Sequence, residues 1–263
     1  MINILIPTDF SPNAQVATDY AIGQFTHSKV QFTLYHAVIQ PRSYSGMLVN
    51  ITDIMLNDAR DLLNQEITRI KEKFGDGVHL TSATRVGHLE DVINTVIRKN
   101  NIDLVVMGTK GESDVASKVL GSNAEHIIRK SEKPVLTIPN SSTVEQLSEI
   151  LIATDQSELP NAQELQTLLS ALVNQVSISA LTVLTSDTDK APKSIELSGH
   201  QLPVHAENAP KAMEGIENYL HANNVDMLVV YHHHKARLDY LFSRSITKKV
   251  AGNVAIPLLV IPG

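Results

Sequence analysis

Three apolar segments of this chain occur twice, and in the same order. ILIPTDFS (Ile4 to Ser11) returns as ILIATDQS (Ile150 to Ser157). IDLVVM (102–107) returns as VDMLVV (225–230), and KPVLTIP (133–139) returns as IPLLVIP (256–262). The last two pairs share one offset, from 102 to 225 and from 133 to 256, so they align without a gap. Three repeats in one order indicate duplication of a single folding unit.

Each copy alternates apolar strands with amphipathic helices. In the first copy the pattern predicts strands over 3–6, 30–38, 79–87, 102–108 and 134–139. It predicts helices after Ser11, which with Asn13 is a candidate N-cap, and over 52–74, 89–99 and 122–130. Such alternation is typical of a parallel sheet with helices on both faces. We expect an α/β fold of two tandem doubly wound parallel-sheet domains, 1–140 and 148–263, joined by a polar linker.

The second copy is shorter than the first. The repeats of the first strand lie 146 positions apart (4 to 150), whereas those of the last strand lie 123 apart (133 to 256). The second copy is therefore shorter by 146 − 123 = 23 residues. Only KAPKSIELSGH (190–200) stands where the first copy has its long helix. We expect that helix to be truncated or absent, which would leave one sheet face partly uncovered or covered by the other copy.

Composition excludes several classes of function. The chain has 263 residues, a net charge of −6, 4% aromatic residues and no Trp, which disfavours a nucleic-acid partner. It has no cysteine, so disulfides, thiol nucleophiles and Cys-ligated zinc are excluded. The N-terminal run lacks the basic start and cleavage site of a signal peptide, and no apolar stretch approaches the roughly 18 residues of a membrane span. We expect a cytoplasmic protein with no membrane partner.

Glycines follow the fourth strand of the first copy. Gly108 and Gly111 lie two residues apart, and nine residues separate Gly111 from Gly121 and Ser122. Glycines directly after a parallel strand let main-chain N–H groups approach a phosphate. Gly121 and Ser122 then open a helix, whose free N–H groups and dipole favour an anion. An ordinary turn and helix start would give the same residues, and the spacing alone does not separate the two readings.

The pattern Gly-x2-Gly-x9-Gly-Ser after an apolar strand, followed by a helix and KPVLTIP, resembles the ATP-binding signature of the universal stress protein family. ILIPTDFS is similar to the first strand and turn of that family. The resemblance implies an adenine nucleotide α-hydrolase-like fold and an ATP-binding site, with a possible Mg²⁺ ion. The residues that match the family's site are Pro7, Thr8, Asp9, Ala37, Met107, Gly108, Lys110, Gly111, Gly121, Ser122 and Asn123.

Roles for these residues follow from the resemblance. Asp9 is expected beside the adenosine, as an acceptor for a ribose hydroxyl or a ligand for phosphate-bound metal; capping the next helix is the alternative. Ala37 is expected to pack on the adenine, and Met107 with Gly108 to lie near the ribose. The residues expected at the phosphates are Lys110, Gly111, Gly121, Ser122 and Asn123; for Lys110, a solvated loop side chain is the alternative.

The second copy departs from this pattern. The gapless offset puts Tyr231, His234 and Arg244 opposite the three glycines, and only Ser245 matches, opposite Ser122. Side chains at these positions block a main-chain phosphate cradle, so we expect the second copy to be a degenerate partner. In the family, fifth strands commonly pair across a dimer, so 135–138 and 258–261 are expected to join the copies as a pseudo-dimer within one chain, with a homodimer also possible.

The expected function is a stress-response or signalling protein that binds ATP in its first copy only. A scaffold or binding protein for another small ligand is the alternative, and a slow ATPase is a further one, because no base positioned for fast hydrolysis is evident. Segment 46–55 is expected to pack as helix rather than to cover the ligand. The remaining histidines are expected to be structural or to form a polar turn rather than a metal site: His36, His88, His232, His233 and His234 (with Asp155 or His205).

Overall fold

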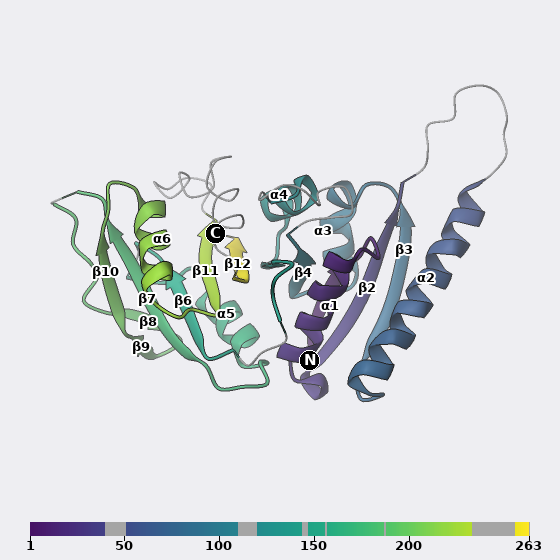
Figure 1. Cartoon of the computed structure of the whole chain (residues 1–263), viewed down its shortest axis with the longest axis horizontal. Helices are drawn as coiled ribbons and strands as arrows, with labels where there is room; N and C mark the ends of the chain where they lie inside the picture. Colours follow the sequence, from purple (N-terminus) through teal and green to yellow (C-terminus); the bar gives the residue numbers. More distant parts are fainter. Residues whose placement is uncertain are drawn as a thin grey trace, which may run out of the picture.

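One ten-stranded sheet runs through the whole molecule (Figure 1). The computed structural model describes residues 1–39, 51–109, 120–143, 147–155, 157–186, 188–232 and 256–262. The strand order is β10-β7-β6-β11-β12-β5-β4-β1-β2-β3, and within each half all neighbours are parallel. The fold is therefore the expected α/β architecture, with five strands from each copy.

The N-terminal half follows the predicted alternation closely. Its first helix is capped by Ser11, whose hydroxyl accepts a bond from the N–H of Ala14 (3.3 Å). Gly75, with φ +86°, ends the long second helix through a bond from its N–H to Lys71 O (2.8 Å). The elements of this half are β1 (Ile2–Pro7), α1 (Pro12–Gln24), a 3-10 turn (His27–Lys29), β2 (Val30–Val38), α2 (Ile51–Phe74), β3 (Leu80–Val86), α3 (Leu89–Lys99), β4 (Leu104–Gly108), α4 (Ser122–Lys130) and β5 (Val135–Ile138).

The C-terminal half replaces the long helix with a β-hairpin. Its elements are β6 (Glu149–Ala153), α5 (Ala162–Leu169), β7 (Ser177–Leu184), β8 (Ile195–Leu197), β9 (His200–Leu202), β10 (Val204–Asn208), α6 (Ala212–Ala222), β11 (Met227–His232) and β12 (Leu258–Pro262). The expectation that the helix is absent is met, since β8 and β9 pair antiparallel in its place.

The expectation of an uncovered sheet face in this half is wrong. Ile195 and Leu197 of β8 are 0% and 2% exposed and belong to the hydrophobic core. The hairpin contacts α5 and β7, so a shorter element of the same half covers the face.

Two hydrophobic cores lie on the two faces of the sheet. Alternating strand residues point to opposite faces, so Ile4 and Ile6 join one core and Leu5 joins the other. The first core receives α1, α2, α5 and the hairpin; the second receives α3, α4 and α6. Both cores contain residues of both halves, so the halves share their interior.

The halves meet where the two fifth strands pair. β5 and β12 run antiparallel, with Leu136 opposite Leu259 and Val135 opposite Val260. Beyond the sheet, the end of α1 meets the end of α5: Thr26 N–H donates to Ala171 O (2.8 Å) and Val173 N–H to Gln24 O (2.8 Å). The strand pairing expected from the sequence is therefore present.

The first half of α2 carries exposed apolar side chains. Ile54 and Leu62 are apolar residues of this helix, but they are 57% and 42% exposed. Residues 51–55 are helical, as expected, although Ile51 is exposed as well; 46–50 lies outside the described residues. Within the described helices, none is long and apolar enough to cross a membrane.

Candidate functional site

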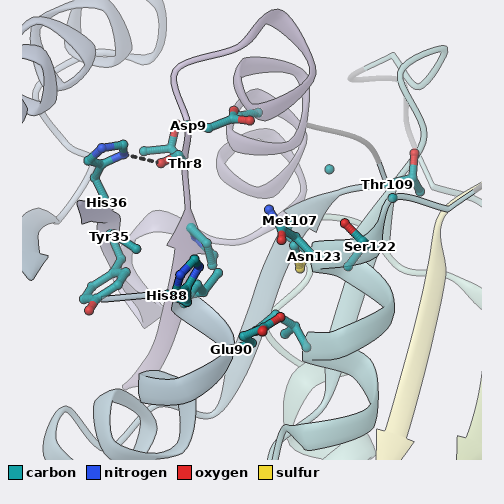
Figure 2. Close-up of a pocket in the computed structure, with 18 of the residues that line it drawn as sticks. Thr8, Asp9, Tyr35, His36, His88, Glu90, Met107, Thr109, Ser122 and Asn123 are labelled. Atoms are coloured by element: carbon teal, nitrogen blue, oxygen red, sulfur yellow. Dashed lines mark hydrogen bonds between the residues drawn. The ribbon is translucent and has the colours of Figure 1, made fainter. Parts of the chain in front are cut away.

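A cavity of about 250 Å³ opens at the carboxyl edge of the N-terminal strands (Figure 2). The ends of β1, β2 and β4 line it, together with the first turns of α3 and α4. Carboxyl ends of parallel strands are where open α/β sheets bind ligands. Nine of the residues expected in the site lie on its wall: Pro7, Thr8, Asp9, Ala37, Met107, Gly108, Gly121, Ser122 and Asn123. Lys110 and Gly111 lie outside the described residues.

The turn after β1 is held by its own side chains. Phe10 adopts φ +64°, and its N–H donates to Thr8 Oγ1 (3.0 Å). Asp9 Oδ1 accepts bonds from Ser11 N–H (3.1 Å) and from the Ser11 hydroxyl (2.6 Å). Asp9 is exposed and on the cavity wall, and Ser11 rather than Asp9 caps α1. Capping, the alternative considered for Asp9, is therefore wrong.

His36 ties the end of β2 to this turn. Its Nδ1 hydrogen-bonds to the carbonyl oxygen of Thr8 at 2.8 Å, as Figure 2 shows. Because a carbonyl accepts, this nitrogen carries the proton. The imidazole also lies against the Phe10 ring, with centroids 4.7 Å apart. His36 thus orients the main chain that carries Thr8 and Asp9.

The first turn of α4 directs main-chain N–H groups at the cavity. Gly121 is the extended N-cap, and Glu125 N–H makes the first helical bond to its carbonyl (3.1 Å). The N–H groups of Ser122, Asn123 and Ala124 precede that bond, and no acceptor for them lies within the described residues. The N–H of Gly121 itself donates to Thr109 O (2.7 Å). The N–H of Gly121 is therefore engaged within the protein, whereas the three N–H groups that follow find no acceptor in the described part of the chain.

The first turn of α3 forms the facing wall. His88 is its N-cap and makes no side-chain capping bond, and Leu89 and Glu90 follow on the cavity wall. Glu90 Oε2 accepts a hydrogen bond from His126 Nδ1 on α4. The pair connects the two helices beside the cavity.

The inner end of the cavity is apolar. Met107 and Tyr35 are 7% and 3% exposed and belong to the core beneath α3 and α4. Burial raises the pKa of the Tyr35 hydroxyl, against the opposing charge of Arg85. The cavity therefore combines an apolar floor with a rim of polar side chains and main-chain N–H groups, the usual makeup of a small-molecule site.

A model of the Universal stress protein family matches residues 1–139 and 197–262 of the chain. The chain belongs to the universal stress protein family. A universal stress protein of Methanocaldococcus jannaschii is 26% identical over 155 residues, which cover 53% of this chain and 96% of that protein. The crystal structure of a universal stress protein from Archaeoglobus fulgidus covers 99% of this chain and 96% of its own, at 19% identity and a TM-score of 0.74. A solved universal stress protein in complex with cAMP covers 53% of this chain and 98% of its own, at 21% identity and a TM-score of 0.42.

In the second half of this universal stress protein, a helix packs tightly on the residue that corresponds to Ala37. Thr154 N–H donates to Leu181 O (3.0 Å) as Thr8 N–H donates to Tyr35 O (2.9 Å), so Val183 is the counterpart of Ala37. Gly215 of α6 packs on Val183 so closely that a Cβ there would lie 2.5 Å from Val183 Cγ1. Helix α6 therefore packs directly on the counterpart of Ala37, a residue that lines the cavity in the first half.

Several residues on the cavity wall were not expected there from the sequence. His36 and His88 were considered structural, and Tyr35, Glu90 and Thr109 were not considered. The usable signal is their position: each lies within four residues of the carboxyl end of β2, β3 or β4. In a doubly wound sheet such ends converge at one edge.

No metal site is found in the described part of the chain, where no three His, Asp or Glu side chains gather closely enough. His205 stacks near Tyr219 instead, with ring centroids 5.2 Å apart. His232 is the last residue of β11, and its side chain, His233 and His234 lie outside what the structure describes. The metal arrangement considered for these histidines gains no support.

Proposed function

We propose that this universal stress protein binds an adenine nucleotide, with ATP as the first candidate, in the cavity of its N-terminal half. One observation carries the proposal: N–H groups at the start of α4, which find no acceptor among the described residues, lie at the same cavity as the apolar floor at the end of β2 and β4. A helix N-terminus favours a phosphate, and an apolar floor favours a base.

The proposed pose follows the wall from β2 to α4. The base would lie near Ala37 and Met107, the ribose near Asp9 and Gly108, and the phosphates near Ser122 and Asn123. Lys110 and Gly111, which match the phosphate-binding stretch of the family, lie outside the described residues. Any Mg²⁺ would arrive with the phosphates, since Asp9 is a single carboxylate and not a metal cage.

We propose one nucleotide site per chain. In the second half, Val183 and Gly215 take up the space that corresponds to the cavity wall at Ala37. The sequence opposite the three glycines adds Tyr231, His234 and Arg244, which would obstruct a main-chain cradle. Both features favour a second half that serves as partner rather than as binding site.

We further propose that domains 1–140 and 148–263 form a pseudo-dimer within the chain. The strand pairing has the symmetry of a two-fold dimer, because Leu136 lies opposite Leu259, its own counterpart at the offset of the repeat. Such self-pairing is the mark of an isologous contact. The expected role is a cytoplasmic stress-response or signalling protein that changes state with bound nucleotide.

Equilibrium binding of ATP to a Gly121→Arg variant tests the site. Arg is the residue opposite Gly121 in the second copy, and its side chain would occupy the cavity wall, so we expect affinity to fall by at least about tenfold. Gly77→Arg is the matched control, because a Cβ at Gly77 meets nothing within 4 Å and the residue is not on the cavity wall. Isothermal titration calorimetry measures the ATP affinity of both variants, and circular dichroism checks that both are folded.

Equal affinity in wild type and Gly121→Arg would refute the site. Failure of wild type to bind ATP, ADP or AMP would favour the alternative of another small ligand. Steady phosphate release that disappears in Asp9→Ala would identify the slow ATPase.

A further inference from the structure

Glu90 places a carboxylate at the cavity, close to the start of α4. Its side chain lies on the cavity wall below Ser122 and Asn123 in Figure 2. It hydrogen-bonds to His126, which is one helical turn, about 5.4 Å, further along α4 than Ser122. The carboxylate therefore lines the same cavity as Ser122 and Asn123, the residues proposed to lie near the phosphates.

The described wall of the cavity has no lysine or arginine that could offset the charge of Glu90. Its ionisable residues are Asp9, Tyr35, His36, His88 and Glu90. The side chain of Glu90 is 29% exposed, so its charge is screened by solvent only in part. An anion at the start of α4 would experience this charge directly.

The contact between α3 and α4 does not depend on Glu90. Asn94 Nδ2 donates to Lys130 O (2.7 Å), and Asn94 Oδ1 accepts from Glu132 N–H (3.0 Å). Arg98 pairs with Glu132 (2.6 Å) a turn further on. These contacts join α3 to the C-terminal end of α4, so the carboxylate at position 90 is not needed to dock the two helices.

We propose that Glu90 is a specificity residue that limits the phosphate charge the cavity accepts. The inference rests on the proposed nucleotide site and narrows it. The carboxylate repels each added phosphate charge near α4, so it lowers affinity for ATP more than for ADP, for ADP more than for AMP, and leaves uncharged adenosine unaffected. His126 holds the carboxylate in this position through its hydrogen bond.

Binding of adenosine, AMP, ADP and ATP to full-length wild type and Glu90→Gln tests the proposal. Gln keeps an oxygen for His126 and removes only the charge. We expect affinity to rise about 2-fold for AMP and about 5- to 10-fold for ATP at low salt, with adenosine unchanged and the gain smaller at high salt. Asp91→Asn is the matched control: it removes one charge from the same turn of α3, at a side chain that pairs with Lys130 (3.5 Å) and is not on the cavity wall.

The proposal is decided by how the gain in affinity changes from adenosine through AMP and ADP to ATP. A gain that grows with phosphate number in Glu90→Gln and in Glu90→Ala, but not in Asp91→Asn, supports the proposal. An equal change for all four ligands, or no change while wild type still binds nucleotides, overturns it and leaves the proposed site intact. Absence of binding by every nucleotide in every variant overturns the proposed function as well.

Discussion

At the scale of single residues, the two halves place the larger side chain of one strand–helix contact on opposite elements. The first half pairs a small residue on the strand, Ala37, with Val92 at the helix position that corresponds to Gly215. The second half has the larger side chain on the strand and none on the helix. This exchange lets α6 approach β7 more closely than a side chain at 215 would permit.

Gly215→Ala is expected to destabilise the protein. The new Cβ would lie 2.5 Å and 2.8 Å from the two Val183 methyl groups, which a stiff β-branched side chain cannot move easily. Overpacking costs about 1–3 kcal/mol, and the gain in helix propensity, about 1 kcal/mol, offsets part of it. Urea denaturation should show a net loss of up to about 2 kcal/mol. Adding Val183→Ala should recover part of the loss; two strictly additive substitutions would contradict the close contact.

Residue identities could be predicted from the sequence where a local rule fixes them. Ser11 as N-cap follows from its position before a helix, and the glycines mark the loop after β4. His36, His88 and Glu90 could not be assigned to the cavity, because their place depends on how strand ends converge in three dimensions. The bond from Gly121 N–H to Thr109 O likewise depends on how the loop returns to β4, which the residue types do not reveal.

At the scale of elements, Asp226 fastens the beginning of β6. Its Oδ2 accepts bonds from Ser148 N–H (2.7 Å), the Ser148 hydroxyl (2.6 Å) and Glu149 N–H (2.9 Å). Partial burial acts to raise the pKa of this carboxyl, but the three bonds outweigh it and the pKa lies below the usual value. Asp103 occupies the same place in the first half and accepts one bond there, from Asn3 N–H (2.9 Å).

Asp226→Asn is expected to cost about 1 kcal/mol at neutral pH, because charge-assisted bonds are lost from a partly exposed site. The folded pKa is depressed, so this stabilisation is present above the unfolded pKa and is lost as pH falls through the folded pKa. The difference between wild type and variant should therefore shrink in acid, measured by urea denaturation from pH 7 to pH 3. Asp103→Asn is the comparison and should cost less; equal costs at every pH would contradict the assignment.

Elements with a strong pattern were predictable almost to the residue. The sequence predicts helices over 89–99 and 122–130, and both are present with those bounds. The hairpin of β8 and β9 was not predicted, because strands of three residues are too short to show a period. They form because Ile195 and Leu197 become buried on the sheet face that the missing helix would have covered.

At the scale of the whole molecule, the sheet and its cores make one cooperative unit. The core on the α1 face contains residues of both halves, and Leu136 and Leu259 at its centre are 1% and 3% exposed. We expect calorimetry to show one unfolding transition whose calorimetric and van't Hoff enthalpies agree. Leu259→Ala should lower the stability of the whole chain by about 2–5 kcal/mol without splitting that transition. Two separate transitions, in wild type or variant, would show that the halves unfold independently.

The repeat made the architecture of the molecule predictable, since two copies of one unit, in an order fixed by the chain, imply two similar sheets. Their union into one sheet through β5 and β12 was expected only from the resemblance. The main-chain hydrogen bonds that Thr26 and Val173 donate to the opposite half were not expected, because the local sequence around each residue gives no sign of a contact with the other half.

The pairing of Leu136 with Leu259 has a genetic consequence. When identical subunits associate, every substitution appears on both sides of the symmetry axis, and neither side can change alone. Here each side is encoded separately while the covalent link keeps them at a fixed ratio of one to one. Val183 and Gly215 could therefore arise in one copy while Ala37 and Val92 persist in the other.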